Sequence, residues 1–202
     1  MIAPDTTSES RSRFDDARRA MIDSQLRTSG VNEPFVLARM GTVPREDFVP
    51  EASRAAAYAD RAVRLPGGGA LPAPLFHGLM LSEARPTSDD TVLVIDGGSG
   101  YLPALLQPMV RALIVVSPED AVAGRIGCNP TLVLIDGAIE ELCDPLNKKL
   151  AEGTRIVTGL VERGVTRLAA GRKAGGAIGL VALAETGVPR LHAFDREAGW
   201  RF

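Results

Sequence analysis

Five short apolar runs in the second half of the chain constrain the fold more than any other feature. They lie at 92–95, 113–116, 132–135, 156–160 and 178–183. Each run has the length and composition of a buried strand, and turn or helix signals separate them. Because strands that alternate with helices form parallel sheets, the pattern predicts a mostly parallel α/β sheet. Lys173-Ala-Gly-Gly176 is typical of a hairpin turn between strands at about 163–172 and 176–184, so we expect an antiparallel edge.

The first half of the chain predicts helices. Amphipathic spacing indicates a helix over 14–29 that Gly30 stops, and a second helix from Asn32, as N-cap, to Met40. The three consecutive glycines within 65–74 predict a loop, and the apolar spacing from Pro74 to Ala84 predicts a further helix.

Composition excludes several classes of partner. With 23 basic and 25 acidic residues, the formal net charge of -2 gives no reason to expect a nucleic-acid or membrane partner. No apolar run approaches the roughly 20 residues of a membrane helix, and the polar start does not resemble a signal peptide, so we expect a cytoplasmic protein. Cys128 and Cys143 lack metal-ligand spacing, which predicts buried, reduced thiols and no metal site.

The most informative stretch for function is Thr91–Tyr101, where an apolar run breaks into a glycine-rich turn. Such a turn lets the backbone approach a nucleotide-type ligand, although it also serves simply to begin a helix with Ser99 as the N-cap. A second run, Leu132–Gly137, also ends in Asp-Gly and should reach the same edge of the sheet; an ordinary strand-ending turn is the alternative for Asp136-Gly137. The spacing lacks the G-x-G-x-x-G pattern of a dinucleotide site.

Four phrases in order identify a resemblance. They are Gln25-Leu-Arg-Thr-Ser-Gly-Val31, Val43-Pro-Arg-Glu-Asp-Phe-Val-Pro50, Ala57-Tyr-Ala-Asp-Arg61 and Val92-Leu-Val-Ile-Asp-Gly-Gly-Ser-Gly-Tyr101. The chain thereby resembles the protein-L-isoaspartate O-methyltransferase family. The resemblance implies a Rossmann-like α/β sheet of the S-adenosylmethionine-dependent methyltransferase type with a helical N-terminal cap. Its members transfer a methyl group from S-adenosylmethionine to the side carboxylate of L-isoaspartyl residues in damaged proteins.

This resemblance also assigns regions and residues. We expect a flexible leader at 1–12 and a single domain at 13–202, with the helical cap and substrate loop in 13–88 and the sheet in 89–202. No catalytic side chain is assigned, because a carboxylate nucleophile is already ionised at neutral pH and needs mainly alignment. The implied, vestigial cofactor-binding residues are Asp96, Gly97, Gly98, Ser99, Gly100 and Ser117.

The chain departs from the family pattern around the cofactor. Val94 stands where the family has an acidic residue, and Asp96 stands where it has a glycine. Ser117 takes the place of the acidic residue that accepts hydrogen bonds from the ribose hydroxyls. Between Ser117 and Leu132, about 25 residues that would form a helix, a strand and a turn are missing, judged by the usual length of a βαβ unit.

The substrate loop departs as well. The family pattern resembles Ile-Ser-Ala-Pro-His, whereas this chain has Leu71-Pro-Ala-Pro-Leu75, so Pro72 replaces the hydroxyl residue and Leu75 the histidine. His77 lies on the following helix and receives no role. Together these departures predict a non-catalytic binding scaffold that has lost or greatly weakened methyl transfer; the alternative is an active carboxyl methyltransferase with a rebuilt pocket.

Two further expectations concern partners and charges. Loss of a βαβ unit should expose an edge or face of the sheet, which favours a homodimer or a protein or peptide partner. Asp89 and Asp90 are typical of a solvated turn before a strand.

Overall fold

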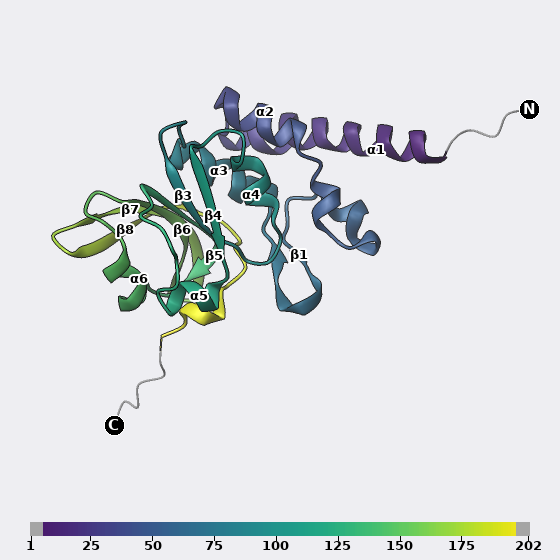
Figure 1. Cartoon of the computed structure of the whole chain (residues 1–202). Helices are drawn as coiled ribbons and strands as arrows, with labels where there is room; N and C mark the ends of the chain where they lie inside the picture. The colour runs from purple at the N-terminus through teal and green to yellow at the C-terminus, as the bar shows by residue number, and fades with distance from the viewer. Residues whose placement is uncertain (1–5, 197–202) are drawn as a thin grey trace, which may run out of the picture.

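The computed structural model describes residues 6–196, and a six-stranded sheet with helices on both faces forms its core (Figure 1). The strands are β3 (Thr91–Ile95), β4 (Ala112–Val116), β5 (Leu132–Ile139), β6 (Arg155–Glu162), β7 (Val165–Ala174) and β8 (Ala177–Glu185). The α-helices are α1 (Thr6–Met21), α2 (Pro34–Thr42), α3 (Pro74–Ala84), α4 (Tyr101–Leu106), α5 (Pro118–Val122) and α6 (Asp144–Lys149). Among residues 6–196, no helix combines the length and the apolar character that crossing a bilayer requires.

The sheet has the order β4-β3-β5-β6-β7-β8. The first four strands are parallel, and β7 and β8 continue the sheet in antiparallel fashion. This arrangement confirms the predicted parallel sheet, its antiparallel edge and the hairpin at Lys173-Ala-Gly-Gly176. β5 extends beyond the predicted run, because its pairing with β6 resumes at Ala138 after an irregularity that follows Ile135.

Two apolar clusters cover the two faces of the sheet. One joins α2, α3 and α4 to the sheet and includes Phe76, Met80 and Leu102. The other lies under α5 and α6 and includes Leu146 and, from the C-terminal part of the chain, Phe194. The parallel strand β3 is therefore buried from both sides, which explains why its sequence is a continuous apolar run and does not alternate.

The helical cap begins earlier than expected. α1 starts at Thr6, so residues 6–12 are helical where we expected a leader; residues 1–5 lie outside the described residues. The helix continues through a π turn (η1, Ile22–Leu26) and a 3-10 turn (η2, Arg27–Ser29). It ends at Gly30, whose φ of 89° is the left-handed conformation that glycine adopts at helix ends, so the predicted stop is confirmed.

Two local predictions were wrong. The second helix, α2, begins after Glu33 and not Asn32, and it runs past Gly41 to Thr42. The expected loop at 65–74 contains a 3-10 turn and β2 (Ala70–Leu71), which pairs with β1 (Val63–Arg64) just before the loop. Gly67 and Gly68 have φ of 85° and 92°, and these left-handed conformations reverse the chain and allow the pairing.

The shortening of the sheet is visible at β4. Between Val116 and Leu132 the chain forms only α5, and this fully described stretch contains no strand. β4 is consequently an edge strand that pairs with β3 alone. The expected absence of a strand-containing unit thus leaves one edge of the parallel sheet open.

Candidate functional site: the crevice at the ends of β3, β4 and β5

The crevice lies at the carboxyl end of β3, which has β4 on one side in the sheet and β5 on the other. In open parallel sheets, ligands bind at such a reversal of strand order, beyond the carboxyl ends of the strands. A cavity of about 440 Å³ lies here. Its lining comprises Pro66, Gly67, Gly68, Gly69, Asp96, Gly97, Gly98, Ser117, Pro118, Glu119, Arg190, Leu191, His192 and Ala193.

Four of the six residues assigned to cofactor binding line this cavity: Asp96, Gly97, Gly98 and Ser117. The other two, Ser99 and Gly100, are engaged inside the loop. The Ser99 hydroxyl donates to Asp136 Oδ2 at 3.3 Å and accepts the Tyr101 N–H at 3.2 Å. The expected N-cap role of Ser99 was wrong by one position, because Gly100 is the N-cap of α4. Gly100 has φ of 69°, and its N–H donates to the Asp96 carboxylate at 3.2 Å.

Asp96 is a half-buried carboxylate without a cationic partner among residues 6–196. Its hydrogen bond from Gly100 N–H comes from the backbone of its own loop. Burial, followed by the nearby negative charge of Asp136, raises the pKa of Asp96 above its usual range. The glycine loop therefore carries an uncompensated acid at its first position.

Ser117, at the end of β4, is occupied with helix capping. Its hydroxyl accepts the Asp120 N–H at 3.1 Å at the start of α5. Three acidic residues near this end of the sheet could replace the missing ribose acceptor: Glu119, Asp120 and Asp136. Asp120 pairs with Arg125 at 2.7 Å, and Asp136 is buried in the domain. Glu119 is the one of these three that lines the cavity.

Behind the glycine loop lies a buried polar chain that the sequence did not reveal. Arg45 Nη1 lies 3.3 Å from His77 Nδ1, and His77 Nε2 lies 2.8 Å from Asp136 Oδ1; all three residues are buried. Because a guanidinium only donates, Nδ1 accepts and Nε2 carries the hydrogen that bonds Asp136. Arg45 also donates to the carbonyls of Ala57 and Pro72. Burial lowers the pKa of Arg45, although nearby Tyr101 and Asp136 oppose this effect.

The C-terminal segment, residues 188–196, covers the crevice. Ala138 N–H donates to Pro189 O at 2.7 Å, and Leu191 N–H donates to Ala138 O at 2.8 Å. These bonds place Leu191 over the loop. An ideal Cβ on Gly137 would lie 2.5 Å from Leu191 Cγ, and one on Gly97 would lie 3.5 Å from Leu191 Cδ2.

Ion pairs and one aromatic ring anchor this segment. Arg190 pairs with Glu140 at 2.7 Å and with Asp195 at 2.6 Å, and Arg196 pairs with Glu141 at 2.9 Å. Phe194 is 2% exposed and packs in the cluster beneath α5 and α6. The opposite side of the loop is covered as well, since Ala70 N–H donates to Gly97 O at 3.2 Å.

Comparison with known proteins identifies the family. The profile of the Protein-L-isoaspartate(D-aspartate) O-methyltransferase (PCMT) family matches residues 16–123, more than half of the chain. The chain belongs to this family. The match ends at Ala123, the C-cap of α5, where the shortened stretch of the isoaspartate methyltransferase sheet lies. By family resemblance, S-adenosylmethionine is the cofactor for which such a crevice is built.

Two curated relatives illustrate the similarity. The Protein-L-isoaspartate O-methyltransferase of Herpetosiphon aurantiacus is 38% identical over 106 residues, which cover 52% of this chain and 47% of the relative. The enzyme of the same description from Methanoregula boonei is 29% identical over 167 residues, covering 70% of this chain and 77% of the relative. The chain thus spans about half the length of the first relative.

Solved isoaspartate methyltransferase structures share the fold. A Plasmodium falciparum protein of this description, solved in complex with S-adenosyl-L-homocysteine, gives a TM-score of 0.68 at 17% identity and covers 88% of this chain and 97% of its own. A second protein-L-isoaspartate O-methyltransferase gives a TM-score of 0.69 at 16% identity, covering 86% and 65%. The predicted methyltransferase-type fold is confirmed.

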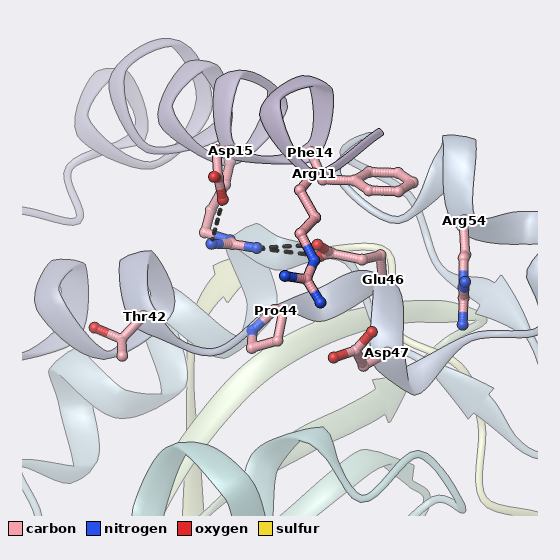
Figure 2. Close-up of a pocket in the computed structure, with 9 residues that line it drawn as sticks. Arg11, Phe14, Asp15, Thr42, Pro44, Glu46, Asp47 and Arg54 are labelled. Carbon is pink, nitrogen blue, oxygen red and sulfur yellow. Dashed lines mark hydrogen bonds and ion pairs between the residues drawn. The ribbon is translucent and has the colours of Figure 1, made fainter. Parts of the chain in front are cut away.

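A second cavity, of about 490 Å³, separates the cap helix α1 from residues 42–54 (Figure 2). Arg18 closes its base, bonding Asp15 at 3.1 Å, Glu46 at 3.0 Å and the Tyr58 hydroxyl at 2.8 Å. Burial, and then the hydrogen bond to Glu46, raises the pKa of Tyr58. These side chains form hydrogen bonds and ion pairs with one another, so they join the cap helix to the rest of the domain.

Proposed function

We propose that this protein is a divergent isoaspartate methyltransferase family member that has lost or greatly weakened methyl transfer and acts in the cytoplasm as a non-catalytic binding scaffold. The position of Leu191 over Gly97 and Gly137 carries the proposal. Glycines at such a site leave room for a ligand to approach the backbone. Here the Leu191 side chain takes that room at Gly137, and at Gly97 it lies in van der Waals contact. Leu191 also borders the cavity of about 440 Å³ that Gly97 and Gly98 line, so its position supports weakened binding of the family cofactor.

The loss of hydrogen-bond partners for the cofactor supports the same proposal. The position of the ribose-binding acid holds Ser117, whose hydroxyl already accepts from Asp120 N–H. The unit that would carry the turn on the adenine side is absent. A hydrogen bond to a charged group contributes roughly 1.5 to 3 kcal/mol, so losing two contacts weakens binding by about 3 to 6 kcal/mol, on the order of a hundredfold to ten-thousandfold.

A calorimetric titration of the full chain with S-adenosylhomocysteine tests the proposal. We expect no saturable heat up to millimolar ligand, whereas an active relative measured in the same buffer should bind in the micromolar range. Incubation with S-adenosylmethionine and an isoaspartyl peptide should give no methyl ester above background. Micromolar binding together with methylation at the rate of the active relative would overturn the proposal.

The alternative function is an active, S-adenosylmethionine-dependent carboxyl methyltransferase acting on isoaspartyl residues. Glu119 favours it, because this residue lines the same cavity as Gly97 and Gly98 and its carboxylate is the type of group that would accept the ribose hydroxyls in place of the missing acid. This function predicts that Glu119→Gln loses S-adenosylhomocysteine affinity, whereas Asp120→Asn does not. Asp120 is the matched control since its carboxylate pairs with Arg125.

A further inference from the structure

The described surface exposes three large apolar side chains: Val115 at 47%, Val181 at 65% and Leu183 at 48%. Val181 and Leu183 lie close together on β8 and line one groove, with Ala170 of β7 in its floor and Glu83 of α3 on its border. Val115 lies on β4, at the opposite edge of the sheet. Adjacent apolar side chains on a surface mark a contact site more strongly than a single one does.

The groove exists because α3 covers only part of its face of the sheet. Ile178 and Leu180 point to the other face and pack against the cluster beneath α5 and α6. Val181 and Leu183 point to the α3 face, but α3 packs on β6 and β7 and leaves β8 uncovered (Figure 1). No helix among the described residues covers this face of β8, so a partner that packs on it would bury Val181 and Leu183.

The charges beside the groove favour a second copy of the chain as that layer. Glu83 and Arg172 both line the groove, and neither has an ion-pair partner within residues 6–196. Arg172 donates one hydrogen bond to Gly153 O at 3.3 Å. In a two-fold contact the same patch meets itself, so Glu83 of one copy can pair with Arg172 of the other on both sides of the axis.

We infer that the α3–β8 groove is the contact surface of a homodimer. Val181 and Leu183 form its apolar centre, and reciprocal Glu83–Arg172 pairs fix its orientation. The open edge of β4 is the competing surface, but it offers only one exposed large apolar side chain among the described residues, Val115. The inference does not depend on whether the crevice binds a cofactor.

Charge reversal tests the inference in the full-length protein. Light scattering after size exclusion should give twice the chain mass of 21.4 kDa. Glu83→Arg or Arg172→Glu alone should raise the dimer dissociation constant at least about tenfold, because each places like charges together, and the double variant should restore it to near the original value. Val181→Lys should give a monomer, whereas Val115→Lys should leave the dimer intact.

Three outcomes would overturn the inference. The first is a monomeric mass for the unmodified protein. The second is a dimer that Val115→Lys dissociates and Val181→Lys does not, which assigns the contact to β4. The third is a pair of charge reversals whose effects add without restoration. All substituted positions are exposed, so the far-ultraviolet circular dichroism spectrum of each variant at 25 °C should match that of the original protein and exclude unfolding as the cause of a lost dimer.

Discussion

Leu191 occupies the space that a side chain on Gly137 would need. A Cβ on Gly137 would lie 2.5, 2.8 and 2.9 Å from Cγ, Cδ2 and Cδ1 of Leu191, closer than carbon atoms approach in a packed protein. Gly137 lies in β5 next to the strand irregularity, and Leu191 arrives from the C-terminal segment 54 positions later in the chain. Covering the crevice therefore depends on a fit between two distant parts of the sequence.

This fit predicts strong coupling between the two positions. Gly137→Ala should lower the free energy of unfolding by about 1 to 3 kcal/mol, the usual effect of overpacking, because Leu191 and its segment must move. In a Leu191→Ala background the added methyl group has room, so the same substitution should have an effect of only a few tenths of a kcal/mol. Urea unfolding of the four proteins measures the cycle. Equal effects of Gly137→Ala in both backgrounds would show that Leu191 does not fill this space.

The raised pKa of Asp96 predicts that its contribution to the stability of the folded protein decreases as pH rises. Burial, and then the charge of Asp136, raises the pKa of Asp96 in the folded protein, so the folded state holds its proton more tightly than the unfolded state does. This contribution to stability is full below the unfolded pKa of about 3.9 and is lost as pH rises through the higher folded pKa. Asp96→Asn should therefore raise the melting temperature at pH 7, with the gain shrinking toward pH 4.

Asp90 supplies the control with the opposite sign. Burial raises its pKa, but hydrogen bonds from Thr131, Thr87 and Arg155 outweigh burial and lower it overall. Its stabilisation is present above the unfolded pKa and is lost as pH falls through the folded pKa. Asp90→Asn should thus destabilise at pH 7 by about 1.5 to 3 kcal/mol, the contribution of hydrogen bonds to a charged group. If Asp96→Asn and Asp90→Asn shift the melting temperature in the same direction at pH 7, the assignment for Asp96 is wrong.

Asp90 also shows where sequence reasoning stops. The strands could be predicted because each is a local apolar run. The short stretch between Ser117 and Leu132 predicted an exposed edge or face of the sheet, and the structure has β4 at that edge. Asp90 was expected in a solvated turn, yet it is 7% exposed and bonds Arg155 at 2.8 Å. Its partner lies 65 positions away, and no local pattern encodes such a pairing.

The crevice likewise has one part that the sequence predicted and one part that it did not. Glycine-loop residues were recognisable because their spacing is local, and the structure brings four of the six assigned residues to one cavity. The covering segment has neither periodicity nor a motif, and its position depends on backbone bonds to Ala138 that form only when the sheet has folded. Cys128 and Cys143 were expected to be buried; both are half-buried, Cys128 in the loop after α5 and Cys143 as the N-cap of α6.

The buried chain Arg45–His77–Asp136 gives the last prediction. Arg45→Met keeps much of the side-chain volume but removes the positive charge that His77 connects to Asp136 by hydrogen bonds. It also leaves the carbonyls of Ala57 and Pro72 without their donor. Removing one partner of a buried ionic group costs about 3 to 5 kcal/mol, because the other charge stays buried without compensation. Urea unfolding at neutral pH should show this loss. Adding Asp136→Asn to Arg45→Met should recover part of it, since the uncompensated charge is then gone; a double variant less stable than the sum of the single effects would show that Arg45 does not balance Asp136.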